Sequence, residues 1–263
     1  MIFATDLDRT LIYSHLFLDE ADCEYELIEK KGEKPIAYMS KKAIGLLEEL
    51  HTKAHIIPIT LRNETEFHRI DLFKKNIVPE IFVTNNGGTI YYKGQEDKSW
   101  TNHINEQMVK MPISHEKIKG QFLNHYHGLI EKEVNCGNLI WLFMGERDHI
   151  DYEAVQSFES TFKDTGWRID VSGRKIYVYP YFVTKWCALS YIKENYFKEE
   201  IFAAGDSIFD MEMVEKADYG MIPKASYIEE QIKDHVMITN HKGMRAAEDI
   251  LAKVIEIVEE KEI

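Results

Sequence analysis

The chain has 263 residues, enough to bury a sizeable core in one large or two modest domains. Its net charge of −13 argues against a nucleic-acid backbone as partner, although one site can still be locally positive and bind a small anion. The start shows neither a basic region nor a long apolar stretch, and the apolar run Leu139–Met144 is too short to span a bilayer, so we expect no membrane partner. The three cysteines form no C-x-x-C pair, which is typical of reduced thiols, and we therefore expect a cytoplasmic protein.

The first ten residues combine a predicted strand with two acids. Ile2 to Thr5 is an apolar, β-prone run typical of a buried strand. Asp6 and Asp8 follow at a spacing of two, which in extended chain points both side chains to one side. Two carboxylates about 4 Å apart repel by roughly 4 kcal/mol at an effective dielectric near 20. They therefore need a cation, a shared proton or solvent, and a solvated acidic turn explains this stretch alone equally well.

Alternating strand and helix patterns follow up to residue 88. Residues 11–39 predict a β-hairpin flap, centred on 19–39, that either serves the site or is a plain surface hairpin. The next elements are a helix capped by Ser40, a strand from His55 to Thr60, a helix from Asn63 through Phe73, and a strand Ile81–Thr84 closed by Asn85–Gly88. This β-α-β-α-β order predicts a parallel sheet with covering helices.

The pattern changes between residues 88 and 180. Helical periodicity covers 104–127 and 150–164, and strands pair across tight turns at Asn135–Asn138 and Ser172–Arg174. These features predict an α+β cap domain at 88–180, inserted into a Rossmann-like α/β core formed by 1–87 and 181–263. Parallel-type elements resume with a helix from Trp186 and a strand Ile201–Gly205, and the chain closes with an amphipathic helix.

Residues that could bind a ligand or a metal follow the ends of the predicted core strands. Ligands of an open parallel sheet sit beyond the carboxyl ends of its strands, where this chain carries Asp6, Asp8, Thr60, Asp206 and Asp210. Lys185 stands at a helix start, which suits a phosphate. Four carboxylates around one lysine would be unbalanced without a metal, and an all-oxygen ligand set indicates Mg²⁺.

Three other groups of residues could have a functional role, but a structural role explains each of them better. His125 and His127 with Cys136 resemble a metal cluster, but a spacing of two on a helix points the two histidines apart. Arg62 is interpreted as a structural ion pair more readily than as a substrate contact. Arg174 and Lys175 fit a solvated turn better than an anion site.

The motif order D-x-D-x-T, strand-terminal Thr60, Lys185 and G-D-S-x-x-D resembles the haloacid dehalogenase-like hydrolase superfamily. The size and place of the insertion resemble its Cof-type and sucrose-phosphate-phosphatase-like branch. The resemblance runs through the core and reaches the insertion only in size and strand order.

The resemblance implies roles for the matching residues. Asp6 would be the nucleophile that accepts the phosphoryl group, and Asp8 the acid and base. Thr60 and Lys185 would hold phosphoryl oxygens. Magnesium would be bound by Asp6, the backbone carbonyl of Asp8 and Asp206, with Asp210 close behind.

The chain departs from the family pattern at four positions near these motifs. The family usually has glycine where this chain has Arg9, Leu61 and Trp186, and asparagine where it has Phe209. We expect these large side chains to narrow the entrance. Trp186 or Phe209 would then offer a flat wall to substrate, unless both turn inward as helix-core residues.

The expected function is a magnesium-dependent phosphatase that hydrolyses a small phosphorylated metabolite, such as a sugar phosphate, through an aspartyl-phosphate. A phosphotransferase or phosphomutase would share that intermediate. A sensor that binds magnesium and a phosphorylated ligand would need no Asp8. The substrate's identity and the oligomeric state stay open.

Overall fold

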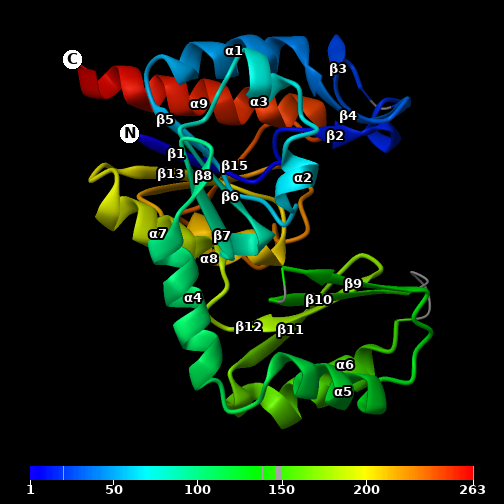
Figure 1. Ribbon diagram of the computed structural model, residues 1–263. Helices are drawn as coiled ribbons and strands as arrows, with labels where there is room; N and C mark the ends of the chain where they lie inside the picture. The colour runs from blue at the N-terminus through cyan, green and yellow to red at the C-terminus, as the bar shows by residue number, and fades with distance from the viewer. Residues whose placement is uncertain (20, 138, 146–149, 263) are drawn as a thin grey trace. The chain divides into compact units, whose positions relative to one another are not determined.

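A computed structural model gives the fold of residues 1–19, 21–137, 139–145 and 150–262 (Figure 1). The chain divides into two units. Met1–Glu96 and Lys185–Ile263 form the first, here named the core unit, and Asp97–Thr184 forms the second, the inserted unit.

The core unit is built on a parallel sheet in the order β15-β14-β13-β1-β5. Its strands are β1 (Ile2–Thr5), β5 (His55–Pro58), β13 (Ile201–Ala204), β14 (Tyr219–Ile222) and β15 (Met237–Ile238). Every residue of β1 is buried, because the strand pairs with β13 on one side and β5 on the other. The predicted Rossmann-like parallel sheet is therefore confirmed, and the first strand lies inside it.

Helices cover both faces of this sheet. Figure 1 shows α1 (Lys41–His51) and α9 (Met244–Glu262) side by side on one face, with α7 (Lys185–Asn195) and α8 (Ile208–Lys216) on the other. Ser40 caps α1 as expected, since its Oγ accepts a hydrogen bond from the Ala43 N–H at 3.1 Å. The apolar faces of α1 and α9 pack into one core with the sheet.

The predicted hairpin flap is present. It consists of β3 (Tyr25–Lys31) and β4 (Lys34–Ser40). The short strand β2 (Tyr13–Ser14) pairs with β4 and is followed by the 3₁₀ helix η1 (His15–Phe17). Gly32 makes the turn with φ of 61°, a left-handed conformation that favours glycine.

The helix expected from Asn63 through Phe73 is wrong in one respect. Two short helices occupy this stretch, α2 (Glu64–Phe67) and α3 (Leu72–Lys75). The hairpin interrupts them, because the Asp71 N–H donates to the Ile28 carbonyl at 2.9 Å and Ile70 forms a bridge with Glu29. Tertiary pairing has overridden local helical periodicity here.

A small antiparallel sheet completes the core unit. It contains β6 (Ile81–Thr84), β7 (Thr89–Tyr92) and β8 (Gln95–Glu96) in that order, with the 3₁₀ turn η2 (Asn85–Gly87) between the first two. Asn85 and Asn86 adopt left-handed φ angles of 52° and 57°, which asparagine tolerates better than most residues. The chain leaves the core unit after β8.

The inserted unit is an α+β structure. Its antiparallel sheet runs β11-β12-β10-β9, and its strands are β9 (Lys132–Cys136), β10 (Ile140–Met144), β11 (Trp167–Ser172) and β12 (Lys175–Pro180). Its helices are α4 (Lys98–Lys110), α5 (His115–His125), α6 (Tyr152–Phe162) and the 3₁₀ helix η4 (Lys163–Thr165). The predicted turn at 135–138 ends on Asn138, outside the described residues. Across the described chain, no helix combines the length and apolar character needed to cross a membrane.

Candidate active site

Two neighbouring strand ends position the acids of the candidate site. Asp6 follows β1 and Asp206 follows β13, whose last residues are in register, Thr5 beside Ala204. The Asp6 N–H continues this pairing by donating to the Ala204 carbonyl at 2.9 Å. Parallel pairing thus brings together two acids that lie far apart in the sequence.

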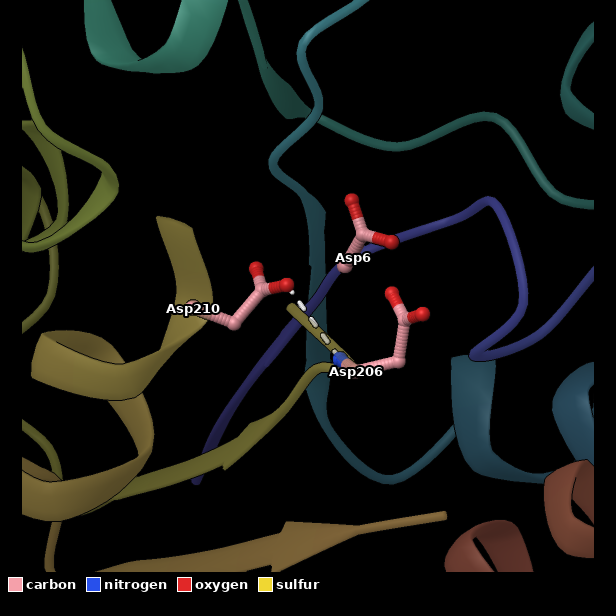
Figure 2. A group of neighbouring side chains, drawn as sticks. All are labelled: Asp6, Asp206 and Asp210. Carbon is pink, nitrogen blue, oxygen red and sulfur yellow. Dashed lines mark hydrogen bonds between the residues drawn. The ribbon is translucent and has the colours of Figure 1, made fainter. Parts of the chain in front are cut away.

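Three carboxylates meet at this edge of the sheet. Oxygens of Asp6, Asp206 and Asp210 all lie within 4.8 Å of one another, and Figure 2 shows the side chains converging. Their exposed fractions are 6%, 5% and 0%. We name these three residues, with Lys185, the acidic cluster.

The start of α8 fixes Asp210. Its Oδ2 accepts hydrogen bonds from the Asp206 N–H at 3.2 Å, drawn in Figure 2, and from the Ser207 hydroxyl at 2.7 Å. Gly205 permits this close approach, because a Cβ at that position would lie 2.2 Å from the Asp210 Cβ. Glycine is therefore required for α8 to begin directly against the end of β13.

Lys185 joins the acids from the first residue of α7. Its Nζ donates to Asp6 Oδ1 at 2.5 Å and to Asp210 Oδ1 at 2.6 Å, and its side chain is fully buried. Burial alone would lower the pKa of Lys185, but attraction to Asp210 and Asp6 outweighs it and raises that pKa. The lysine is therefore a fixed positive charge.

One lysine does not neutralise three buried carboxylates. Burial raises the pKa of Asp6 to about 7 against the opposing pull of Lys185, and repulsion from Asp210 and Asp8 adds to the rise. Burial, followed by repulsion from Asp6 and Asp210, likewise raises the pKa of Asp206 well above its usual value. Oxygen-only ligands with excess negative charge suit a hard divalent cation, so these residues fit Mg²⁺.

Asp8 is held away from the acidic cluster. Its carboxylate receives a fork of hydrogen bonds from Arg62, Nε to Oδ2 at 2.7 Å and Nη2 to Oδ1 at 2.8 Å, and 57% of its side chain is exposed. The interpretation of Arg62 as an ion-pair residue is thereby confirmed. Burial opposes the charge of Arg62, but the hydrogen bond with Asp8 leads the effects that raise its pKa.

Arg62 also reaches a carboxylate that sequence analysis missed. Glu29 of β3 is fully buried and accepts from Arg62 Nη1 at 2.8 Å and from Arg69 Nε at 2.9 Å. We name Glu29, Arg62, Arg69 and Asp8 the arginine cluster. Register shifts on both sides of Glu29 break the hairpin's alternation, so the polarity pattern gave no sign that this acid faces inward.

Thr60 lies buried beyond the end of β5. Its N–H donates to the Val83 carbonyl at 3.0 Å, and its hydroxyl oxygen accepts from the Arg62 N–H at 3.2 Å. β5 neighbours β1, so Thr60 follows the strand next to the one that carries Asp6.

The four unusual positions have different surroundings. Phe209 is buried, which favours its interpretation as a helix-core residue, and the Lys216 ammonium lies 5.7 Å from the ring of half-buried Trp186. Leu61 is half-buried. Arg9 adopts a left-handed φ of 66°.

The second metal-site candidate, His125 and His127 with Cys136, is not tested, because one of its side chains lies outside the described residues. Among the residues that the structure describes, the group able to hold a metal through three or more His, Cys, Asp or Glu side chains is Asp6, Asp206 and Asp210. His125 ends α5 and His127 lies beyond it, while the Cys136 side chain is outside what the structure describes.

Comparison with protein families gives a match over most of the chain. Residues 45–243 match the family described as haloacid dehalogenase-like hydrolase. A search of curated proteins by sequence returns no match.

Comparison with solved structures shows the same fold. The sucrose-phosphatase of Synechocystis sp. PCC6803, solved with sucrose and phosphate, superposes with a TM-score of 0.69 at 14% identity, covering 97% of both chains. A haloacid dehalogenase subclass IIB sugar phosphatase gives 0.63 at 13% identity, covering 97% of this chain and 98% of its own. A Thermoplasma acidophilum protein gives 0.62 at 17% identity, covering 98% and 97%.

Proposed function

Because the chain belongs to the haloacid dehalogenase-like hydrolase family, we propose that it is a magnesium-dependent phosphatase of a small phosphorylated metabolite. The observation that carries this proposal is the buried convergence of Asp6, Asp206 and Asp210 on Lys185. Two of the similar structures are a sucrose-phosphatase and a sugar phosphatase, which supports a sugar phosphate as substrate.

The metal would be held by Asp6, Asp206 and the backbone carbonyl of Asp8, with Asp210 close behind. When bound, magnesium supplies positive charge that offsets these carboxylates and the substrate's phosphate. Lys185 and Thr60 would hold phosphoryl oxygens, the first through its ammonium and the second through its hydroxyl.

The reaction proceeds in two displacements. A carboxylate oxygen of Asp6 forms a bond to phosphorus while the bond from phosphorus to the ester oxygen breaks, and Asp8 gives that oxygen a proton. Water then attacks the aspartyl-phosphate and gives its proton to Asp8. Asp6 is regenerated and inorganic phosphate leaves.

Asp8 must change partner during this cycle. In the structure both carboxylate oxygens of Asp8 accept hydrogen bonds from Arg62, at 2.7 and 2.8 Å. The proposal therefore requires Asp8 to exchange the Arg62 fork for the ester oxygen. Its exposed side chain leaves room for that exchange.

Phosphate release from a panel of phosphorylated metabolites, with magnesium present, tests the proposal. We expect turnover of at least one sugar phosphate and none after addition of excess chelator. Asp6→Asn, prepared identically, controls for a contaminating phosphatase. Full activity in chelator, or equal activity in the variant, would show that the site is not the one proposed.

Product analysis separates the rival functions. A phosphotransferase or phosphomutase would pass the phosphoryl group to an added sugar acceptor, whereas a phosphatase releases inorganic phosphate. A sensor would bind the phosphorylated ligand without turnover. The presence of both Asp6 and Asp8 supports the enzyme, since a pure binder needs no proton shuttle.

A further inference from the structure

A pocket of about 320 Å³ opens beside Asp206 within the core unit. Its walls come from the segment after β1, from the loop 223–227 after β14, and from residues 242–245 at the start of α9. That volume lies in the range of small-molecule sites. Asp206 connects the pocket directly to the acidic cluster.

The charge of this pocket is opposite to that of the protein. Four basic residues, Arg9, Lys224, Lys242 and Arg245, line it against two acids, Asp22 and Asp206, although the chain as a whole carries −13. Asp22 and Arg245 pair with each other at 2.9 Å. Over its whole lining the pocket therefore carries more positive than negative side chains, so it suits an anion.

Arg9 lines this pocket with its backbone in a strained conformation. Its φ of 66° is unfavourable for any residue with a Cβ, and glycine would adopt it freely. Its guanidinium carbon lies 4.7 Å from the centre of the Tyr227 ring and 5.8 Å from that of Phe17. A strained arginine directly after Asp8, held over aromatic rings, indicates a role for its side chain.

Two further features of the pocket lining bear on anion binding. Met244 and Arg245 begin α9 and Gly243 precedes them, so the positive end of this 19-residue helix lines the pocket. The Oγ of Ser226, a lining residue, is buried without a hydrogen-bond partner in the described structure.

We propose that this pocket binds the non-reacting end of the substrate, and that this end carries a second anionic group, a carboxylate or a phosphate. The inference rests on the proposed function, in which the reacting phosphate lies at Asp6, and it narrows the substrate to a doubly anionic phosphomonoester. Arg9 and Lys242 bind the second anion, while Tyr13 and Phe17 contact the carbon frame between the two groups.

Matched substrate pairs test the inference. Glucose 6-phosphate is compared with 6-phosphogluconate, which adds a carboxylate, and fructose 6-phosphate with fructose 1,6-bisphosphate, which adds a phosphate. We expect kcat/KM to favour the doubly anionic member of at least one pair by about tenfold or more, and the pair that responds identifies the anion.

Two variants test whether the preference for doubly anionic substrates arises in this pocket. Arg9→Gly removes the charge and relieves the backbone strain, so its folding is not endangered. Lys242→Gln removes a charge from the lining segment just before α9. In each, the ratio of kcat/KM within the pair should fall at least fivefold, or by about 1 kcal/mol. Lys75→Gln, at an exposed lysine of α3 outside the pocket, should keep the ratio.

Binding measurements test the pocket inference independently of the proposed phosphatase activity. Calorimetric titration of Asp6→Asn with the same pairs, in magnesium, measures the preference without turnover. Preferential binding that Arg9→Gly removes supports the pocket even if no phosphate is released, an outcome that would overturn only the phosphatase. Turnover or binding with equal affinity for both members of each pair, or a preference unchanged in both pocket variants, overturns the inference.

Discussion

The acidic cluster and the arginine cluster both bury charge in the core unit, but they are balanced differently. In the first, three carboxylates share one ammonium, and burial raises the pKa of Asp6 and Asp206. In the second, Arg62 and Arg69 face Glu29 and Asp8, two charges of each sign, at distances of 2.7–2.9 Å. A balanced cluster can hold a fold together by itself. An unbalanced one needs a further cation and is suited to bind one.

The largest difference should appear when one carboxylate is neutralised in each cluster and activity is measured. Asp6→Asn should lower phosphate release by about ten-thousand-fold or more, because an amide is a poor nucleophile for phosphorus. Circular dichroism should show an intact fold, since the change removes a repelling charge. Phosphatase activity above that of a mock preparation would contradict the nucleophile assignment.

Asp8→Asn gives the counterpart in the arginine cluster. Loss of the proton shuttle should lower activity by about a hundred- to ten-thousand-fold. A substrate whose leaving group needs no proton, such as 4-nitrophenyl phosphate, should lose less than a sugar phosphate in the first displacement. An equal loss in single-turnover burst rates for both substrates would mean that Asp8 does not act as the acid.

Stability should respond in the opposite order. Glu29→Gln should cost about 3–5 kcal/mol in urea unfolding, because two arginines lose their shared buried partner. Glu66→Gln is the matched control: this exposed acid also contacts Arg69, at 3.7 Å, and its loss should cost less than about 1 kcal/mol. If the two variants unfold at the same urea concentration, the burial of Glu29 does not carry the stability assigned to it.

Magnesium should raise the free energy of unfolding by binding at the acidic cluster, and the arginine cluster should not contribute to this effect. At a hundredfold excess over its Kd, the metal should add about 2.7 kcal/mol to the wild-type free energy of unfolding. Asp206→Asn should lose most of this gain, yet equal or exceed the wild type without metal because mutual repulsion is reduced. Calcium should stabilise while supporting much less turnover, since its looser coordination misplaces the reacting groups. A full magnesium effect in Asp206→Asn would exclude this residue as a ligand.

The smallest effect is expected at Asp170 in the inserted unit, a half-buried acid whose partner is neutral. It accepts a hydrogen bond from the Tyr179 hydroxyl, and burial, partly opposed by that bond, raises its pKa above 3.8. The folded state therefore holds the proton more tightly than the unfolded state, and stability is lost as the pH rises through the raised pKa. Asp170→Asn should remove this loss, leaving the variant equal to or up to about 1 kcal/mol more stable than wild type at pH 7. Thermal unfolding of both proteins between pH 4 and 7 measures the difference; identical pH profiles would mean that Asp170 contributes none of it.

Sequence analysis reached the acidic cluster because its geometry follows from a general rule. Strand ends of a parallel sheet meet at one edge, so Asp6 and Asp206 could be placed together from their positions alone. The family resemblance assigned roles that the residues by themselves left open. The residues of the acidic cluster can thus be predicted from short local motifs.

The rest of the site depends on tertiary pairing that local patterns do not encode. Glu29 turns inward at a bulge, and the predicted helix after Asn63 is divided because the hairpin takes up the Asp71 N–H. Arg9 and Tyr227 belong to loops more than two hundred positions apart, and neither loop has periodicity. Only the folded chain shows that these residues share a pocket.

The place of β1 also determines when the acidic cluster can form during synthesis. Asp6 and the lysine that holds it lie 179 positions apart in the chain. β5 can pair with β1 early, while the other edge of β1 must wait for β13. Such long-range parallel pairing is slow, because the chain loses loop entropy before it gains contacts. A nascent chain that ends before Asp206 therefore carries Asp6 without the site, and the repelling acids come together only once the chain through Asp210 has been made.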